Sequence, residues 1–199
     1  VYVPTLIFSN LRAGSNFEDS EARTVVGTNG LGSTLTNIFS TEFIVDTADG
    51  KNRLVQKFSN NMNKIGEPKV TPCDKHYTKI TYKPDLSRFG MQSFGGDFYM
   101  QIKKRVIDAA ACNPRVKFYF NNENISFKKF EDYAKLYCDD EIYTEGNKTW
   151  DVCVSASKNG FQNISFVNGT YTYDGGRHVD YIANQIVEYL REKIKKKYK

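Results

Sequence analysis

The sequence contains little histidine and cysteine, and it has no long apolar run. Of 199 residues two are histidine and four are cysteine, namely Cys73, Cys112, Cys138 and Cys153, without a Cys-x-x-Cys pair among them. This spacing gives no support to a structural zinc site or a disulfide framework, so we expect reduced thiols and no metal ligands. No apolar run approaches the ~20 residues that cross a bilayer, and no secretory signal opens the chain. We therefore expect an intracellular protein without a membrane partner.

The chain also lacks an initiator methionine. Because it opens inside an apolar segment, residues 1–8, we expect it to be part of a longer protein. Its 40% hydrophobic and 14% aromatic residues are typical of a packed globular core. The formal net charge is +5, and the last seven residues contain five lysines: Lys193, Lys195, Lys196, Lys197 and Lys199. A polyanion would be attracted there, but a solvated helix end is the simpler interpretation.

A glycine-rich loop is the most informative motif. Residues 27–34 read Gly-Thr-Asn-Gly-Leu-Gly-Ser-Thr and lead into a short helical pattern that ends at Ser40. Gly27, Gly30 and Gly32 let main-chain N–H groups approach an anion without a Cβ in the way. The first N–H groups of a helix have no intrahelical partner, and Ser33 and Thr34 add hydroxyl donors there. The motif therefore indicates a phosphate site, and the simplest alternative is a structural turn.

Two commoner glycine loops do not fit. A Walker loop needs Lys-Ser/Thr after its last glycine, whereas Ser33 and Thr34 follow Gly32 without a lysine. A dinucleotide-binding loop reads G-x-G-x-x-G after a buried strand. Here the order is G-x-x-G-x-G, and the preceding residues 16–23 are polar and charged. We expect residues 16–23 to form a mobile lid.

The first part of the chain has strand patterns. Alternation predicts strands at residues 41–47, 52–58, 77–83 and 116–120, with a hairpin turn at Ala48-Asp49-Gly50 and an antiparallel meander beyond it. Helical spacing predicts a helix over residues 97–111. A sheet with helices on one face is the economical arrangement for this order.

The later part changes character. A short helical piece at residues 133–137 is followed by an acidic, polar stretch, residues 139–148, which we interpret as a domain boundary. Residues 150–156 and 162–168 then predict a hairpin around a turn at Lys158-Asn159-Gly160.

A glycine pair, Gly175-Gly176, introduces the last predicted helix. Its apolar stripe predicts ordinary core packing and consists of Val179, Ile182, Ile186, Leu190 and Ile194.

Several blocks of residues, in one order through nearly the whole chain, are similar to a single family. They include Asn29-Gly30-x-Gly32 and Gly175-Gly176-Arg177-His178, and together they cover residues 2–8, 15–19, 29–41, 84–89, 160–168 and 175–181. On these blocks the chain resembles the ATPase region of the type IIA DNA topoisomerases, especially the eukaryotic, large-virus and phage enzymes.

The resemblance implies an α+β fold in two parts. Residues 1–146 would be the C-terminal part of a GHKL-type ATPase sandwich, with a mixed or antiparallel sheet, helices on one face, and the ATP lid and glycine loop at residues 9–40. Residues 147–199 would be the first half of a ribosomal-protein-S5-like transducer domain. In such enzymes ATP binding closes two protomers into a gate that captures a DNA duplex.

Carried over residue by residue, the resemblance also implies a nucleotide site. Ser15 and Asn16 match lid positions that touch ribose or phosphates, and Thr78 matches a threonine that helps to hold adenine. The loop that wraps the triphosphate would consist of Gly27, Thr28, Asn29, Gly30, Leu31, Gly32, Ser33 and Thr34. A Cβ added at Gly30 or Gly32 is expected to clash with bound phosphate, and Gly30→Ala is expected to leave the melting temperature nearly unchanged.

The loop also departs from the family pattern. Thr28, Leu31 and Thr34 stand where cellular eukaryotic enzymes have Arg, Tyr and Lys, and Gly14 replaces a lid serine. Main-chain donors survive these changes, but charge-assisted contacts to phosphate do not. The pattern leans toward a viral or phage relative.

Three further family elements have no counterpart in this sequence. They are the acidic general base with its magnesium-binding asparagine, the adenine-binding Asp-x-Gly-x-Gly stretch, and a later Gln-Thr-Lys. The resemblance thus implies ATP and Mg as cofactors of the longer enzyme, with the Mg ligand absent here and no catalytic residue in this chain. We expect the chain alone to hydrolyse ATP poorly or not at all.

The function implied is that of the ATP-binding gate of a homodimeric DNA topoisomerase II that passes one duplex through another. Such an enzyme acts in the nucleus if it is cellular, and in a host cell or virion if it is viral. One alternative is a nucleic-acid-binding or scaffold module, in which the lysine-rich end and the hairpin bind DNA and the glycine loop is structural. Another is a different GHKL-family ATPase, against which the block at residues 175–181 argues.

Overall fold

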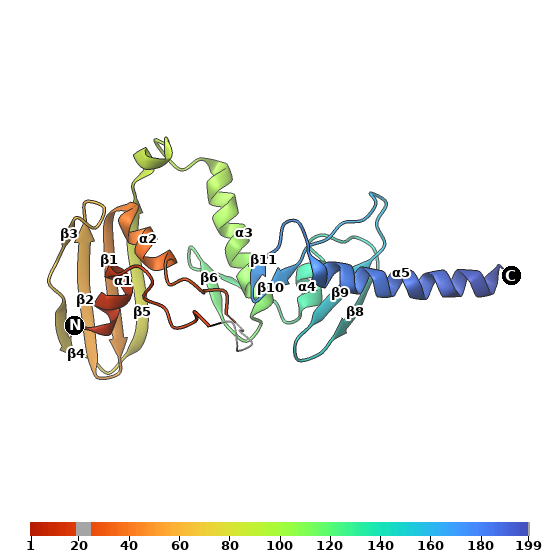
Figure 1. The fold of residues 1–199 in the computed structure, drawn as a ribbon, viewed down its shortest axis with the longest axis horizontal. Coiled ribbons are helices and arrows are strands. Elements are labelled where there is room, and N and C mark those ends of the chain that lie inside the picture. Colours follow the sequence, from red (N-terminus) through yellow and green to blue (C-terminus); the bar gives the residue numbers. More distant parts are fainter. Residues whose placement is uncertain (19–24, 199) are drawn as a thin grey trace. The chain divides into compact units, whose positions relative to one another are not determined.

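The computed structural model describes residues 1–18 and 25–198, and Figure 1 traces the chain. The predicted lid at residues 16–23 therefore lies mostly outside the described residues. The chain forms two compact units, Val1–Gly95 and Gly96–Lys199. The boundary predicted near residue 146 stays a prediction; that residue ends a strand that pairs with the next one along the chain.

The first unit is an antiparallel sheet with two short helices. The sheet has the strand order β3-β2-β1-β5, with β4 also pairing with β2. Its elements are α1 (Val3–Ser9), α2 (Gly32–Ile38), β1 (Ser40–Asp49), β2 (Asn52–Ser59), β3 (Lys64–Ile65), β4 (Lys69–Pro72), β5 (His76–Pro84) and the 3-10 helix η1 (Leu86–Phe89).

The predicted hairpin between β1 and β2 is confirmed, but the meander is wrong in its order. Asp49 closes the hairpin, because its Oδ1 accepts hydrogen bonds from the N–H groups of Lys51 and Asn52 at 2.9 and 2.8 Å. β5 then returns to pair with β1, from Ser40 opposite Pro84 to Asp49 opposite His76. β3 and β4 are too short to offer such a ladder, and the long β1 edge satisfies far more backbone groups of β5.

The core of this unit lies on one face of the sheet. Phe43, Val45 and Phe58 form a buried cluster, against which Phe8 of α1 packs with its ring centroid 5.8 Å from that of Phe43. Both α1 and α2 contact β1, as Figure 1 shows. The predicted layer of helices on one face is therefore present here.

The second unit alternates helices with two-stranded hairpins. β6 pairs with β7, β8 with β9, and β10 with β11, all antiparallel. Its elements are α3 (Gly96–Cys112), β6 (Phe118–Phe120), β7 (Glu123–Ile125), α4 (Phe130–Ala134), β8 (Ile142–Gly146), β9 (Asp151–Ser155), β10 (Phe166–Val167), β11 (Thr170–Tyr171) and α5 (Arg177–Lys197). The helix predicted at residues 97–111 is confirmed, and the one predicted at residues 133–137 begins and ends earlier.

The hairpin predicted between residues 150–156 and 162–168 is wrong. β9 pairs backward with β8, and the Asn147 side chain caps their turn by accepting hydrogen bonds from the N–H groups of Thr149 and Trp150. β10 pairs forward with β11 through Asn168-Gly169, whose φ values of 49° and 74° are the two positive values that a type I′ turn requires. Two tight local turns therefore replace the longer connection that we predicted.

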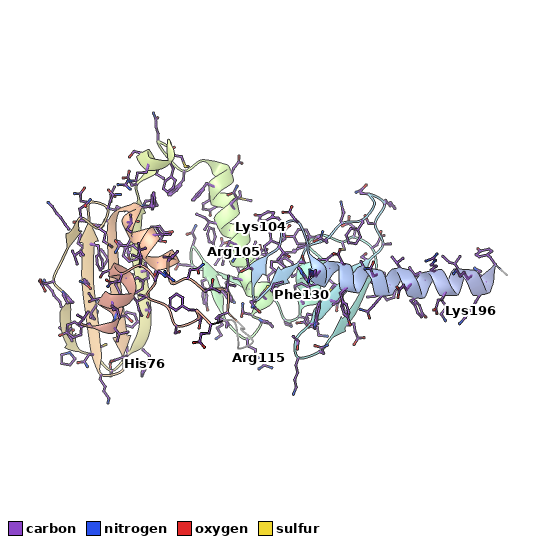
Figure 2. All side chains as sticks on the ribbon, in the orientation of Figure 1. His76, Lys104, Arg105, Arg115, Phe130 and Lys196 are labelled. Carbon is purple, nitrogen blue, oxygen red and sulfur yellow. The ribbon has the colours of Figure 1, made fainter. Side chains whose placement is uncertain are left out.

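A tyrosine lies at the centre of the second unit. Tyr133 is 1% exposed, and its ring contacts those of Phe127 and Phe166 at centroid distances of 5.7 and 5.8 Å. Its hydroxyl donates a 2.8 Å hydrogen bond to the buried Asp108, which also accepts one of 2.7 Å from Lys104 of α3 (Figure 2). This network joins α3 to α4.

The helix predicted after Gly175-Gly176 is confirmed, and both glycines have positive φ, 71° and 140°. Core packing of its apolar stripe is not confirmed: no described residue of α5 is buried, and Leu190 and Ile194 are 51% and 58% exposed. The last turns of α5, near the labelled Lys196 in Figure 2, extend beyond the hairpins of the unit. In the part of the chain that the structure describes, no helix is both long and apolar enough to cross a membrane.

Candidate functional site

The start of α2 is tied to the end of α1 by side-chain hydrogen bonds. The Thr34 hydroxyl lies 3.2 Å from the carbonyl oxygen of Ile7 and 2.9 Å from that of Asn10, and it shares its proton between them. The Asn37 side chain donates to the carbonyl of Phe8 at 3.0 Å. Thr34 and Asn37 are both 0% exposed. The orientation of α2 is therefore fixed by buried polar contacts that also satisfy the terminal carbonyls of α1.

The glycine loop crosses an earlier segment, main chain against main chain. Gly30 has a φ of 58°, and a Cβ built on it would lie 2.5 Å from the nitrogen of Gly14 and 3.0 Å from that of Ala13. The Asn16 side chain adds a 3.0 Å hydrogen bond from its Nδ2 to the carbonyl oxygen of Gly27. Only glycine fits at residue 30, because both the conformation and the close approach exclude a side chain.

Main-chain donors of the loop form no hydrogen bond with the described residues. The first helical hydrogen bond of α2 runs from the N–H of Leu35 to Leu31 at 2.9 Å. Across residues 1–18 and 25–198, no main-chain N–H from Thr28 through Thr34 donates to a protein acceptor. Gly27, Asn29 and Gly32 are exposed. This row of free N–H groups at a helix start is the arrangement that binds phosphate.

The space in front of the helix start is open. A Cβ built on Gly27 or Gly32 would have no atom within 4 Å. The expectation that a Cβ at Gly30 would meet a bound phosphate without disturbing the fold is wrong, because it would first meet residues 13 and 14. At Gly32 the added Cβ would disturb no protein atom, and its clash with phosphate stays a prediction.

Electrostatic attraction at the loop comes from backbone dipoles. Residues 25–40 contain no charged side chain. Arg12, in the segment that the loop crosses, has its guanidinium carbon 5.9 Å from the ring centroid of Phe17. Attraction of an anion to this loop would therefore have to come from N–H groups, each a neutral donor, and from the positive end of α2.

The loop does not fit a magnesium ion by itself. Mg²⁺ in proteins is usually held by one or two carboxylates together with substrate phosphates and water. Residues 25–40 contain neither Asp nor Glu, and the described residues contain no cluster of three or more His, Cys, Asp or Glu. No chemical step of this chain is therefore assigned to magnesium.

The other predicted site residues lie in two places. Ser15 and Asn16 are in the segment that contacts the loop, with the Ser15 hydroxyl 3.4 Å from Oδ1 of Asn16. Thr78 is exposed on β5, opposite Thr47, and their hydroxyl oxygens are 2.9 Å apart. The pairing register puts Thr78 on the same sheet face as Phe43 and Val45, which is the face that carries the two helices.

Sequence reasoning missed the role of Gly14. It interpreted this residue as a lost lid serine, whereas Gly14 lets the loop approach: a Cβ on it would lie 3.2 Å from the Cα of Gly30. The buried anchor of Thr34 was also missed, since its hydroxyl was interpreted as a phosphate donor. Neither contact has a local signal, because both join residues far apart in the chain.

Known proteins match both the sequence and the fold. The family model of DNA gyrase B matches residues 116–199. DNA topoisomerase 2 of Pisum sativum is 45% identical over the whole chain, and human DNA topoisomerase 2-alpha is 41% identical over it. The chain spans 15% and 14% of the length of these relatives.

Solved structures agree. The ATPase region of Saccharomyces cerevisiae topoisomerase II has a TM-score of 0.91 and 41% identity, with coverage of 98% of this chain and 54% of that one. The ATPase and transducer domains of the Balamuthia mandrillaris enzyme also have a TM-score of 0.91, at 38% identity. The match covers 98% of this chain and 52% of that one.

Fold and loop together define a GHKL-type α+β architecture. The chain belongs to the type IIA DNA topoisomerases, in the region that contains their ATPase and transducer domains.

Proposed function

We propose that the first unit contributes the phosphate-binding half of an ATP site. The observation that carries this proposal is the row of free N–H groups from Thr28 to Ser33 at the start of α2. Phosphate oxygens would accept hydrogen bonds from these groups and benefit from the helix dipole, a contribution of about 0.3–1 kcal/mol at an exposed site. The matched yeast structure is described as an ATPase region, which supports a nucleotide as the ligand.

The rest of the nucleotide would follow the same sheet face. Thr78 lies on that face, exposed, with its hydroxyl beside that of Thr47, and it is the candidate for a contact to adenine. Ser15 and Asn16 are held near the loop by the bond from Asn16 to Gly27 and are candidates for ribose or phosphate contacts. These residues bind and orient; none of them is suited to remove a proton from water.

In the longer enzyme, ATP would close two copies of this region into a gate around a DNA duplex. The relatives are named DNA topoisomerase 2, which supports DNA as the substrate of the whole protein. The homodimer, the magnesium ion and a nuclear or viral setting belong to the same proposal. No observation on this chain favours a scaffold without nucleotide chemistry.

Gly32→Ala tests the phosphate site. The substitution puts a methyl group into open space in front of the donors, so we expect it to weaken binding of a non-hydrolysable ATP analogue at least tenfold and to leave the melting temperature unchanged. Binding is measured by calorimetry on a polypeptide that joins this chain to the rest of an ATPase region, because the chain spans about half of each matched structure.

Gly95→Ala is the matched control, since a Cβ there also has no atom within 4 Å. It should change neither binding nor melting. Equal nucleotide affinity for the Gly32→Ala variant and the unsubstituted protein would contradict the assignment.

A further inference from the structure

The sheet face opposite α1 and α2 is strongly cationic. Directly paired residues of an antiparallel sheet point to the same side, so the register assigns every strand residue to one face or the other. The face without helices carries two carboxylates, Glu42 and Asp46, and six cations: Arg53, Lys57, Lys64, Lys69, Lys79 and Lys83. The strand residues that point to the other face, the one that carries α1 and α2, include no lysine or arginine.

Both carboxylates are already neutralised. Arg53 binds Asp46 with two parallel hydrogen bonds, Nε to Oδ1 at 2.8 Å and Nη2 to Oδ2 at 2.7 Å. Glu42 forms an ion pair with Lys57 and has Lys83 at 3.5 Å. On the strand residues of this face, six cations therefore stand against two carboxylates.

Three of the lysines form no close ion pair, although Lys79 lies opposite Asp46 in the register and helps to lower the pKa of that carboxyl. Lys64, Lys69 and Lys79 are exposed, and none forms an ion pair with any of the residues that the structure describes. They come from three different strands, β3, β4 and β5. Cations held apart on a flat surface and left unpaired are available to a partner with several negative charges.

The register also sets the spacing of these charges. Lys69, Val55, Asp46 and Lys79 form one row across four strands, and Lys64, Ser59, Glu42 and Lys83 form a second. Each row spans three strand separations, ~14 Å, and the rows lie four residues apart along β1, ~13 Å. Four of the six cations thus lie at the ends of two parallel rows, and Arg53 and Lys57 lie outside these rows.

We propose that this cationic sheet face contacts the two phosphate backbones of a DNA duplex. The row separation is similar to the ~12 Å width of the major groove of B-DNA, which lies between the two backbones. The contact that we propose is made by lysines to phosphate oxygens, which carry no sequence information, so it is independent of sequence. The proposal rests on the proposed function only in that the longer enzyme handles DNA, and it concerns a surface separate from the glycine loop.

The test removes the three unpaired lysines together, as Lys64→Gln, Lys69→Gln and Lys79→Gln, in the full chain. Binding of a fluorescent duplex of roughly 20 base pairs is followed by anisotropy between about 50 and 200 mM salt. Each phosphate contact contributes about 0.9 to the slope of log affinity against log salt, so we expect the slope to become shallower by about 2–3.

The matched control is Lys117→Gln, Lys148→Gln and Lys158→Gln, three exposed lysines of the second unit that form no ion pair with a described residue. It has the same change in net charge, and we expect it to alter the slope by less than about 1. An unchanged slope in the sheet variant, or an equal loss in the control, would overturn the proposal.

A competition experiment identifies the partner. If polyglutamate binds the unsubstituted chain more tightly than the duplex does, and the sheet variant loses that binding, the partner is an acidic polypeptide and the proposal fails. Circular dichroism should show the same melting for all three proteins. ATP-analogue binding should also be equal among them. Failure of the DNA-binding proposal can therefore be distinguished from failure of the proposed nucleotide site.

Discussion

Gly30 and Gly14 lie so close that a Cβ on Gly30 would be 2.5 Å from the main-chain nitrogen of Gly14. This contact joins the glycine loop to the segment before it, and it gives Gly30 a structural role that differs from that of Gly32. A substitution at Gly30 should therefore disturb the fold, whereas a substitution at Gly32 should affect only ligand binding.

Gly30→Ala should destabilise the chain. An alanine at a φ of 58° is strained by about 1–2 kcal/mol, and forcing its methyl group against residues 13 and 14 adds about 1–3 kcal/mol. We expect a loss of about 2–4 kcal/mol in the free energy of unfolding, measured with urea. Gly32→Ala should stay within about 0.5 kcal/mol of the unsubstituted chain. Equal stability of the two variants would contradict the close contact.

Thr34→Val should loosen α2. The valine keeps the shape of threonine but removes the hydroxyl that lies against the carbonyls of Ile7 and Asn10. Losing a part-buried hydrogen bond of this kind costs about 0.5–1.5 kcal/mol, since the Ser33 hydroxyl remains 3.4 Å from the Ile7 carbonyl, and we expect a corresponding fall in unfolding free energy. Thr34→Ser retains the hydroxyl and should recover at least half of the loss. If valine is as stable as threonine, the hydroxyl does not anchor the helix.

The ion pair of Asp46 and Arg53 should make stability fall in acid. The hydrogen bonds from Arg53 lower the pKa of Asp46 from 3.8 to about 2, against a smaller opposing effect of burial. Because the folded-state pKa is the lower one, the contribution is present above about pH 4 and is lost as pH falls from 4 to 2. Solvent screens the half-exposed arginine, so we expect a loss of about 1 kcal/mol.

Asp46→Asn is the variant for this acid titration. Its unfolding free energy, followed with urea from pH 5 to pH 2, should fall less steeply than that of the unsubstituted chain. Parallel curves for the two proteins would exclude a contribution of this pair.

Tyr133→Phe should weaken the second unit. Burial raises the pKa of the Tyr133 hydroxyl, which stays protonated and donates to Asp108. Removing this donor from a buried carboxylate should lower the unfolding free energy by about 1–3 kcal/mol. Tyr119→Phe, at an exposed tyrosine of β6, is the matched control and should have no effect. A neutral result for Tyr133→Phe would show that water replaces the hydroxyl.

The chain on its own should hydrolyse ATP poorly or not at all. The glycine loop supplies donors for phosphate, but residues 25–40 contain no carboxylate that could take a proton from water or bind magnesium. A steady-state assay with and without magnesium measures this, with a polypeptide that spans a whole ATPase region as reference. Magnesium-dependent turnover by the chain near that of the reference would contradict the prediction.

Much of the local structure could be predicted from the sequence. Alternation of polar and apolar residues identified β1, β2 and β5, and helical spacing identified α3 and α5. Both patterns depend only on residues that are close together in the sequence. The strand order could not be predicted in this way, because the partner of β5 depends on which ladder is longest. The turn at Asn168-Gly169 had a clear local signal, but Asn168 was assigned to the end of a strand.

The site was predictable in part. The glycines and the helix start are adjacent in sequence, so their donors could be inferred. The contacts of Gly30 with Gly14 and of Thr34 with Asn10 join distant residues, and a single sequence contains no signal for such pairs. For this reason Gly30 and Thr34 were assigned to ligand binding, and their structural contacts could not be predicted.

The anchoring of Thr34 and Asn37 on the last carbonyls of α1 has a dynamic consequence. Since these buried bonds must break before either short helix can separate from the other, α1 and α2 should open as one cooperative unit. Their amide protons should then exchange with deuterium at a common rate. A disturbance that reaches the first helix would reorient the phosphate donors by the same rigid displacement.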